Sequence, residues 1–460
     1  MLFPELSVRK GVIRNLASQL FTRLFSNIGV RLLQVPILLQ VLGGDAYGRW
    51  LLLSTVPAWL TLSHLGFGTV AGNEILISVS SGDEKKANTL YATSWKMALL
   101  CSMILIPLVV AATAGLPIED WVGMGSGKAW EVRASLCCLC LSVVISLFTD
   151  IFSMRLRAGR RSDTASYLLG FQLWMELFLI WWWTRDGSEF WRLGLANLVS
   201  TITCLVLTVV AGWRLLPNLR LQMRLGSGKD IVRLFRKSMH YQMLPLGHAV
   251  ILQGQLLVVN GCLGTAAVAL FSTARTFVRL ASQTTELVNH SVWPELSRLF
   301  GKGDISKAAR LHRLSVSVAF TAICLICLLL YWTGIPVYTW WTKSILSIDK
   351  GLLFCFLVSV PLTALWYTSS IVHLSYNRYE SLAYRYLLAA SLSLAACYVL
   401  SIYWGLKGAA ISTLLCDVMM IPFVIATSLQ LTHDRLPGIL SRIWQDALAV
   451  IPSIHSVRRS

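Results

Sequence analysis

The sequence predicts an all-α, polytopic membrane protein, and three observations lead to that fold class. Of the 460 residues, 55% are hydrophobic and 13% are charged, whereas soluble proteins carry about 25% charged residues. Hydrophobic runs place about twelve helices, each long enough to cross a ~30 Å hydrocarbon core. The 18 tryptophans and 13 tyrosines suit aromatic belts at the two membrane–water interfaces. The polar gaps between the runs are too short for a separate soluble domain.

The predicted spans follow one another with short connections. They cover residues 13–41, 48–74, 93–115, 134–154, 165–184, 190–215, 239–262, 265–296, 312–335, 352–376, 381–404 and 408–431. The first and the eighth have low hydropathy, because polar and basic side chains interrupt them. These two spans therefore attract attention as candidates for the lining of a cavity.

The placement of lysine and arginine predicts the orientation of the chain. With a cytoplasmic N-terminus, 28 of the 40 basic residues fall on the cytoplasmic side, eight fall outside and four lie inside the membrane. Because cytoplasmic loops carry the excess of basic residues, this split predicts that both termini are cytoplasmic. The net charge of +18 is thereby explained by topology and anionic headgroups, and no nucleic acid is expected as a partner.

An internal repeat divides the chain into two halves. The pattern Glu74-x7-Gly82-Asp83-x2-Lys86 recurs as Glu295-x7-Gly303-Asp304-x2-Lys307, an offset of 221 residues. Six spans separate the copies, so the halves run the same way and are expected to be related by a pseudo-twofold axis along the membrane normal. We expect an N-terminal lobe over 1–216, a C-terminal lobe over 217–432 with a linker at 217–238, and a basic cytoplasmic tail over 433–460.

Span 8 carries a polar stripe that a lipid-facing helix would not have. At about 100° per residue, the stripe falls on one arc of the helix. Its members are Ser272, Arg275, Arg279, Ser282, Gln283, Glu286, Asn289 and His290. We predict that this arc lines a wet, positively charged cavity between the two halves.

Span 1 repeats this pattern, and span 7 adds further polar side chains. The span 1 stripe contains Gln19, Arg23, Asn27, Arg31 and Gln34; span 7 contributes His248 and Gln255. An arginine at the centre of a transmembrane helix costs about 2.5–3.5 kcal/mol on insertion scales, which implies a compensating anion or water. Arginine suits phosphate because its planar fork donates two parallel hydrogen bonds. Arg23, Arg31, Arg275 and Arg279 are therefore the predicted anion ligands.

Two other interpretations of these residues stay open. The arginines could extend to the interface or pair with the intramembrane carboxylates Asp150, Glu176, Glu286 and Asp417. The amides and His248 could serve only interhelical hydrogen bonding. Glu286, Glu176 and Asp417 are candidates for coupling transport to an ion gradient.

The sequence contains no pattern typical of an enzyme. The 11 cysteines fall in apolar segments without metal or disulfide spacing. No phosphate-binding glycine loop and no nucleophile–base arrangement is present, so neither a metal nor a cofactor is expected. The longest external loop, roughly 116–133, shows no catalytic constellation.

Several segments carry a resemblance to a known family, first among them the opening RNLASQLFTRLFSNIGVRLLQVPILLQVLGGDAYGRW. It is similar to the first span and loop of the bacterial polysaccharide-repeat (O-antigen, Wzx-type) flippases of the multidrug/oligosaccharidyl-lipid/polysaccharide (MOP) exporter superfamily. Residues 153–168 look like its loop between spans 4 and 5, and residues 272–299 look like its span 8. Trp404-Gly405-x2-Gly408-Ala409-Ala410 is similar to the start of its span 12. The resemblance covers about residues 12–432.

The resemblance implies two six-helix lobes that form a V around a cationic cavity. It implies transport of an oligosaccharide on undecaprenyl diphosphate from the cytoplasmic to the periplasmic leaflet of the inner membrane, by alternating access. The pathway would be O-antigen, lipopolysaccharide, exopolysaccharide or capsule synthesis, with a polymerase and chain-length proteins as possible partners. The alternatives are a drug or cation antiporter of the same superfamily, a peptidoglycan-precursor flippase, which has fourteen spans, and a polytopic polymerase or ligase.

Overall fold

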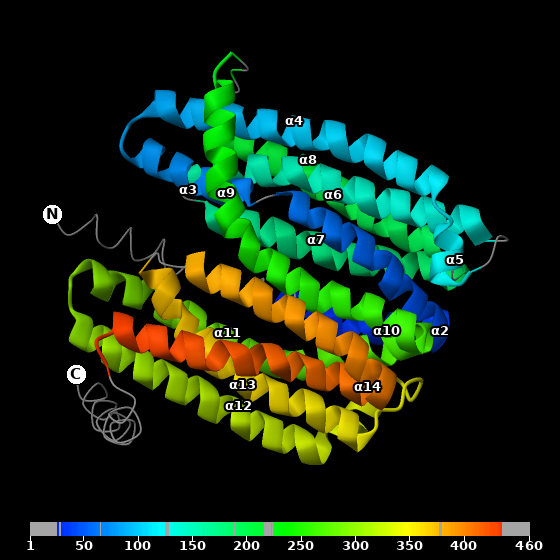
Figure 1. The fold of residues 1–460 in the computed structure, drawn as a ribbon. Helices are drawn as coiled ribbons and strands as arrows, with labels where there is room; N and C mark the ends of the chain where they lie inside the picture. The colour runs from blue at the N-terminus through cyan, green and yellow to red at the C-terminus, as the bar shows by residue number, and fades with distance from the viewer. Residues whose placement is uncertain are drawn as a thin grey trace, which may run out of the picture. The chain divides into compact units, whose positions relative to one another are not determined.

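The computed structural model describes two compact helical units. It covers residues 25–26, 29–64, 66–124, 128–159, 161–187, 189–215, 222, 224–376 and 380–434, which contain helices and turns but no strand. The units are Met1–Pro245 and Leu246–Ser460, and Figure 1 shows the helices of each. The all-α class predicted from the sequence is confirmed.

The first unit is built on the pairing of its long antiparallel helices. Helix α6 packs most extensively on α8, and α4, α3, α2 and α7 pack beside it (Figure 1). The elements are α2 (Gly29–Leu60), a 3₁₀ turn (Thr61–His64), α3 (Phe67–Ser80), α4 (Glu84–Gly115), α5 (Ile118–Val122), α6 (Ala129–Ala158), α7 (Ser162–Trp183), a 3₁₀ turn (Thr184–Asp186), α8 (Phe190–Leu215) and α9 (Gly228–Ala249).

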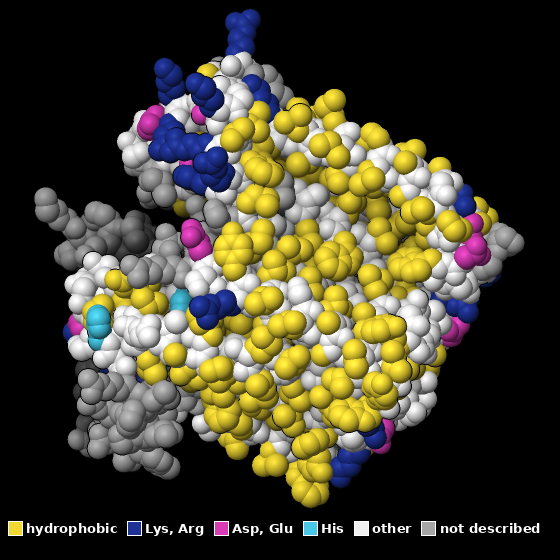
Figure 2. Space-filling model, in the orientation of Figure 1, with side chains coloured by type: hydrophobic (Ala, Val, Ile, Leu, Met, Phe, Trp, Pro, Cys, Tyr) yellow, Lys and Arg dark blue, Asp and Glu magenta, His cyan; other side chains and the backbone are white. Residues whose placement is uncertain are grey.

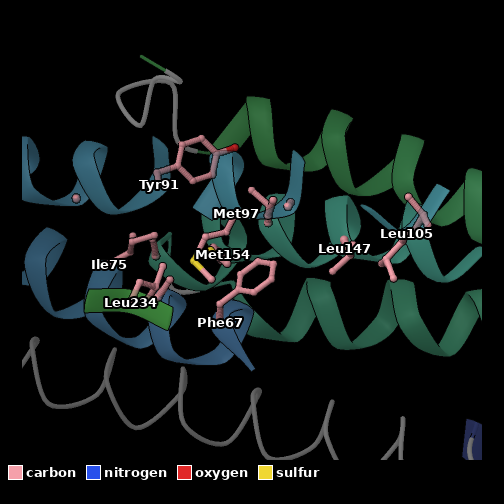
Figure 3. Close-up of a cluster of buried hydrophobic side chains, with 14 residues drawn as sticks. Phe67, Ile75, Tyr91, Met97, Leu105, Leu147, Met154 and Leu234 are labelled. Atoms are coloured by element: carbon pink, nitrogen blue, oxygen red, sulfur yellow. The ribbon is translucent and has the colours of Figure 1, made fainter. Parts of the chain in front are cut away.

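A buried cluster joins three of these helices, α3, α4 and α6, to the start of α9. Figure 3 shows Phe67 and Ile75 of α3 facing Met154 of α6, with Leu234 of α9 beside them. Leu234 is only 3% exposed. The first half of α9 is further held by Lys237, whose Nζ lies 2.5 Å from the Glu74 carboxylate, and by Gln242, which donates to the Leu62 carbonyl. The compact units consequently divide at Pro245, after the 217–238 linker expected from the sequence.

The second unit stacks α13 against three neighbours. Helix α13 packs on α14, α12 and α11, and α10 packs on α14 (Figure 1). The elements are a π-helical turn (Val250–Gly254), α10 (Gln255–Leu263), α11 (Thr265–Gly301), α12 (Ile305–Trp341), α13 (Lys350–Ser375) and α14 (Glu380–Leu431). Helix α14 is broken at Gly405, which has φ 56°, and so contains both of the spans predicted at 381–404 and 408–431.

The span predicted at 48–74 differs from the helices that the structure shows. It is interrupted: α2 ends at Leu60, and a 3₁₀ turn and Gly66 (φ 63°) precede α3. The Thr61 hydroxyl donates to the Pro57 carbonyl where α2 passes into this turn. The span predicted at 239–262 is present as the continuous helical stretch Gln242–Leu263, which contains the π-helical turn.

The internal repeat has the same local geometry in each unit. Gly82 and Gly303 have φ of 79° and 72°. The aspartates that follow them, Asp83 and Asp304, cap α4 and α12 by accepting from Lys86 N and Lys307 N. A glycine is required at each turn because an L-residue in the left-handed region is strained. The repeated motif is therefore a turn followed by a helix cap.

Apolar side chains cover the outer surfaces of the long helices. Seven helices in the described ranges are long and apolar enough to cross a bilayer. In α4 and α12 only 22% of the residues in the apolar window are buried, the smallest share among the seven. Figure 2 shows hydrophobic side chains spread over most of the visible surface, with lysine and arginine gathered near the start of α9. Water would not solvate such a surface, so the chain is a polytopic membrane protein.

Candidate functional site

A cavity of about 180 Å³ lies inside the second unit. Its walls come from the start of the second unit and from helices α11, α13 and α14. The lining residues are His248, Ile251 and Leu252; Arg275, Val278, Arg279, Ser282, Gln283, Thr285 and Glu286 of α11; Phe356, Ser359, Val360, Thr363, Ala364, Trp366 and Tyr367 of α13; and Tyr386, Thr413, Cys416 and Asp417 of α14. The polar stripe predicted on span 8 thus supplies one whole wall.

Arg275 is the most deeply placed cation of this wall. Its side chain is 9% exposed, and its Nη2 donates to the Leu252 carbonyl at 2.8 Å. Its Nη1 lies 3.4 Å from both the Ile251 carbonyl and Gln255 Oε1. Within the described part of the chain, no carboxylate forms an ion pair with Arg275. Its guanidinium is therefore hydrogen-bonded to neutral oxygens only, although Glu286 and Asp417 line the same cavity.

Arg279 lies one helical turn further along the same wall. Both guanidiniums line the cavity, and Arg279 is half-buried. Like charges four residues apart on a helix repel each other, and the repulsion is larger where water is excluded. An anion placed between the two guanidiniums would lower this repulsion.

A buried carboxylate also lines the cavity. Asp417 of α14 is 6% exposed, and its Oδ1 accepts from Thr363 Oγ1 at 2.9 Å and from Trp366 Nε1 at 2.8 Å. Both donors are uncharged, so this oxygen is hydrogen-bonded without forming an ion pair. The carboxylate is thus held in one orientation while it keeps the capacity to take up a proton or a cation.

Aromatic rings form much of the remaining wall. The Tyr386 ring lies 5.4 Å from Trp366 and 5.0 Å from His248, measured between centroids. Phe271 supports Arg275 from below, with the guanidinium carbon 5.2 Å from the ring centre. Flat apolar rings beside hydrogen-bonding groups suit ligands that have both apolar and polar faces, as sugars do.

The structure brings some of the predicted polar residues to the cavity and places others elsewhere. His248, Gln283 and Glu286 line it. Gln255, predicted to line the cavity, is instead fully buried between helices, where its Nε2 donates to Ser412 Oγ at 3.3 Å. Asn289 and His290 are not among the lining residues; Asn289 is 6% exposed, and its amide has no hydrogen-bond partner among the described residues. Ser272, at the start of the stripe, is not among the lining residues either, so the stripe lines the cavity only over its middle part, from Arg275 to Glu286.

The remaining candidates belong to the first unit. Arg31 is exposed on α2, and Gln34 on the same helix is half-buried. Glu176, on α7, is half-buried. Gln19, Arg23 and Asn27 fall outside the described residues. Roles for all of these side chains stay predictions.

Sequence reasoning missed the contribution of span 10 to the cavity. Thr363, Trp366 and Tyr367 interrupt an apolar run with hydroxyl, indole and phenol groups, and this mixture is the signal that could have identified them.

A second polar cluster was also missed in the first unit: His64 Nδ1 lies 3.2 Å from Asp150 Oδ2, and His64 Nε2 lies 3.3 Å from Ser146 Oγ. Pairing across 86 positions of sequence cannot be read from a helical pattern.

Comparisons with known proteins identify the fold. No protein-family model matches the chain, and no curated protein matches it. An inward-facing multidrug resistance MATE family transporter of the MOP superfamily superposes with a TM-score of 0.72 at 14% identity, over 92% of this chain and 99% of that one. An outward-facing MATE family transporter gives 0.65 at 15% identity, over 93% and 97%.

A third structure is relevant to the charge of the cavity. It is a MOP superfamily transporter from Pyrococcus furiosus, described as having a binding pocket of reversed polarity that suggests a different function. It superposes with a TM-score of 0.65 at 14% identity, over 94% of this chain and 96% of that one. Identities this low establish the fold and leave the activity to the site itself. The chain has the fold of the MOP-superfamily transporters.

Proposed function

We propose that the chain is a flippase that moves oligosaccharides carried on undecaprenyl diphosphate from the cytoplasmic to the periplasmic leaflet. The observation that carries this proposal is the cavity wall formed by Arg275 and Arg279, with no ion-paired carboxylate for Arg275 among the described residues. A diphosphate would give Arg275 a charged partner, and a guanidinium group can donate two parallel hydrogen bonds to phosphate oxygens. The resemblance of span 8 and of the first loop to polysaccharide-repeat flippases supports the same substrate class.

The cavity suits one end of such a substrate. Its volume of about 180 Å³ is below the roughly 300–1,000 Å³ of pockets that enclose a drug-sized ligand. It accommodates the charged head and the adjacent part of the first sugar, and the prenyl chain stays in lipid. Ser282, Gln283 and His248 offer hydrogen bonds to hydroxyl groups, while Trp366 and Tyr367 offer flat apolar surfaces.

Coupling to an ion gradient is assigned to carboxylates. Asp417 is the strongest candidate, because it faces the same cavity as the arginines and is held by neutral donors. Glu286 lies on the arginine wall, and Glu176 belongs to the first unit. In this proposal the protein works in the cytoplasmic membrane, upstream of a polymerase and its chain-length partners, and performs no bond chemistry.

The acidic and aromatic lining of the cavity favours a second function. Asp417 and Glu286 line the cavity together with Trp366, Tyr367 and Tyr386, a combination that suits an organic cation. A drug or cation exporter of the same superfamily would use these groups and leave the arginines as structural residues. The sign of the charge that the substrate carries in the cavity therefore separates the two candidates.

The cellular test uses a strain that lacks its own polysaccharide flippase. Arg31→Ala, Arg275→Ala and Arg279→Ala are scored for surface polysaccharide at equal membrane level. Arg385→Ala is the matched control, because its guanidinium lies 4.0 Å above the Phe423 ring and does not line the cavity. We expect full rescue by the control and loss of rescue by the two cavity variants. Full rescue by all three test variants would contradict the anion site.

The biochemical test separates the two candidates directly. Purified protein in liposomes receives either a lipid-linked oligosaccharide diphosphate or a cationic dye, with an imposed proton or sodium gradient. The flippase proposal expects transfer of the diphosphate and none of the dye. Gradient-driven dye transport without lipid transfer would favour the cation exporter.

A further inference from the structure

The helix that leads into the second unit contains a π-helical stretch that faces the cavity, and we call this stretch the break, although the backbone stays helical through it. Helix α9 includes Pro245, which has no N–H to donate, and then passes into the π-helical turn Val250–Gly254 before α10 begins. Proline and π-helical turns are two of the recognised causes of bending in long helices. The carbonyls of Ile251 and Leu252 lie in this turn, and both residues line the cavity.

Arg275 holds this turn from the neighbouring helix. Its guanidinium donates to the Leu252 carbonyl at 2.8 Å and lies 3.4 Å from the Ile251 carbonyl. One side chain of α11 thus spans two consecutive carbonyls of the break. Because Arg275 also lines the cavity, a group that enters the cavity reaches the same guanidinium.

Hydrogen bonds extend this contact to α14. Arg275 Nη1 lies 3.4 Å from Gln255 Oε1, and the other end of that amide donates to Ser412 Oγ. Ser393 Oγ in turn donates to the Ser412 carbonyl at 2.6 Å. The side chains of Gln255, Ser412 and Ser393 are fully buried. The break is therefore fixed to two helices by one buried polar chain that begins at Arg275.

We propose that Arg275 is a latch on the break between α9 and α10, and that a phosphate group entering the cavity opens it. A charged phosphate oxygen is a stronger acceptor for guanidinium than a neutral carbonyl, so the ligand has the differential affinity needed to shift the equilibrium. Once the two carbonyls are released, the π-helical turn is free to rearrange and α9 to change direction. Arg279 lines the same cavity and binds the ligand in this proposal. The latch rests on the proposed function, since it assumes an anionic substrate.

Hydrogen–deuterium exchange of the amides over 250–256 tests the latch in the full-length protein in nanodiscs. The probes are inorganic pyrophosphate and farnesyl diphosphate, and their binding is measured in parallel by calorimetry. In the wild type we expect either bound probe to speed exchange by about tenfold or more, the change that follows loss of a charge-assisted hydrogen bond. Arg275→Ala should exchange fast without a probe and respond no further.

Further variants make the outcome specific. Arg275→Lys keeps the charge but cannot span two carbonyls, so raised basal exchange is expected, and this variant serves if the alanine protein is not recovered. Arg279→Ala should show slow basal exchange and weaker binding, and Arg385→Ala should behave as the wild type. Probe binding without faster exchange in the wild type overturns the latch but leaves the flippase proposal standing. If neither diphosphate binds, the proposed function fails, and the latch fails with it.

Discussion

Asp417 is a buried side chain whose hydrogen bonds do not by themselves require a carboxylate. Its Oδ1 accepts from Thr363 and Trp366, and an amide oxygen in the same place accepts equally well. We expect Asp417→Asn to keep the unfolding temperature and diphosphate binding while gradient-driven transport is lost. Thermal unfolding in detergent and transport into liposomes measure the two effects.

The control for this substitution removes a hydrogen bond and keeps the charge. Thr363→Val takes away one donor to Asp417, which costs about 0.5–1.5 kcal/mol for a typical hydrogen bond. We expect it to lower stability and to keep coupling. Equal gradient dependence in Asp417→Asn and wild type would remove Asp417 from the coupling mechanism.

Glu119 offers a pH-dependent test outside the membrane-spanning helices. Arg133 donates to both of its carboxylate oxygens, at 2.9 and 3.3 Å, and these hydrogen bonds lower the pKa of Glu119. A lowered folded-state pKa stabilises the protein at pH values above the ordinary carboxyl range of about 4.3, and this contribution is lost as the pH falls through the folded-state pKa. Glu119→Gln should therefore unfold at a lower temperature than wild type at pH 7, with the gap closing toward pH 3. A gap that stays constant with pH would contradict the ion pair.

At the scale of single elements, the repeated turns give a prediction with an internal control. Gly303 has φ 72°, and nothing lies within 4 Å of the position that a Cβ would occupy. Alanine there is therefore destabilised by backbone strain and not by a steric clash. Placing an L-residue in the left-handed region costs about 1–2 kcal/mol. Gly301, two positions earlier, also has open space but no positive φ. We expect Gly303→Ala to lower stability and Gly301→Ala to be neutral or stabilising.

Urea titration of each variant in a mild detergent measures this difference. Gly82→Ala in the first unit has the same geometry, with φ 79°, and should repeat the effect of Gly303→Ala. If Gly301→Ala and Gly303→Ala have equal midpoints, the turn does not depend on the left-handed glycine.

Elements differ in how far the sequence determines them. Helix α8 (Phe190–Leu215) begins and ends where its apolar run predicts, and the caps at Asp83 and Asp304 follow the repeated pattern. The π-helical turn was not predicted, because neither its hydrogen-bond pattern nor its contact with Arg275 on another helix leaves a signal in the local sequence. The presence of Asp417 in one cavity with two arginines was not predicted either, because it depends on how α11 and α14 pack. Local patterns predict spans and stripes, whereas breaks and sites depend on contacts between distant segments.

For the whole molecule, the distribution of apolar and charged side chains explains solubility in lipid and predicts an orientation. Exposed apolar side chains cover α4 and α12, while most basic residues lie in the connections assigned to the cytoplasm. Anionic headgroups and the positive-inside bias hold such connections on one side of the membrane. The fold shared with MOP-superfamily transporters is compatible with this arrangement, but orientation itself is a prediction from the sequence.

Labelling of single cysteines in a cysteine-free background tests that orientation. We expect an impermeant maleimide to label Gly187→Cys and Ser347→Cys in intact cells, because both positions lie in connections assigned to the periplasm. Ser227→Cys and Gly301→Cys, on the basic side, should react only after the inner membrane is opened. This contrast is expected because 28 basic residues fall on the side assigned to the cytoplasm and eight fall on the other side. The reverse pattern would invert the direction of transport, because the basic connections would then face the periplasm.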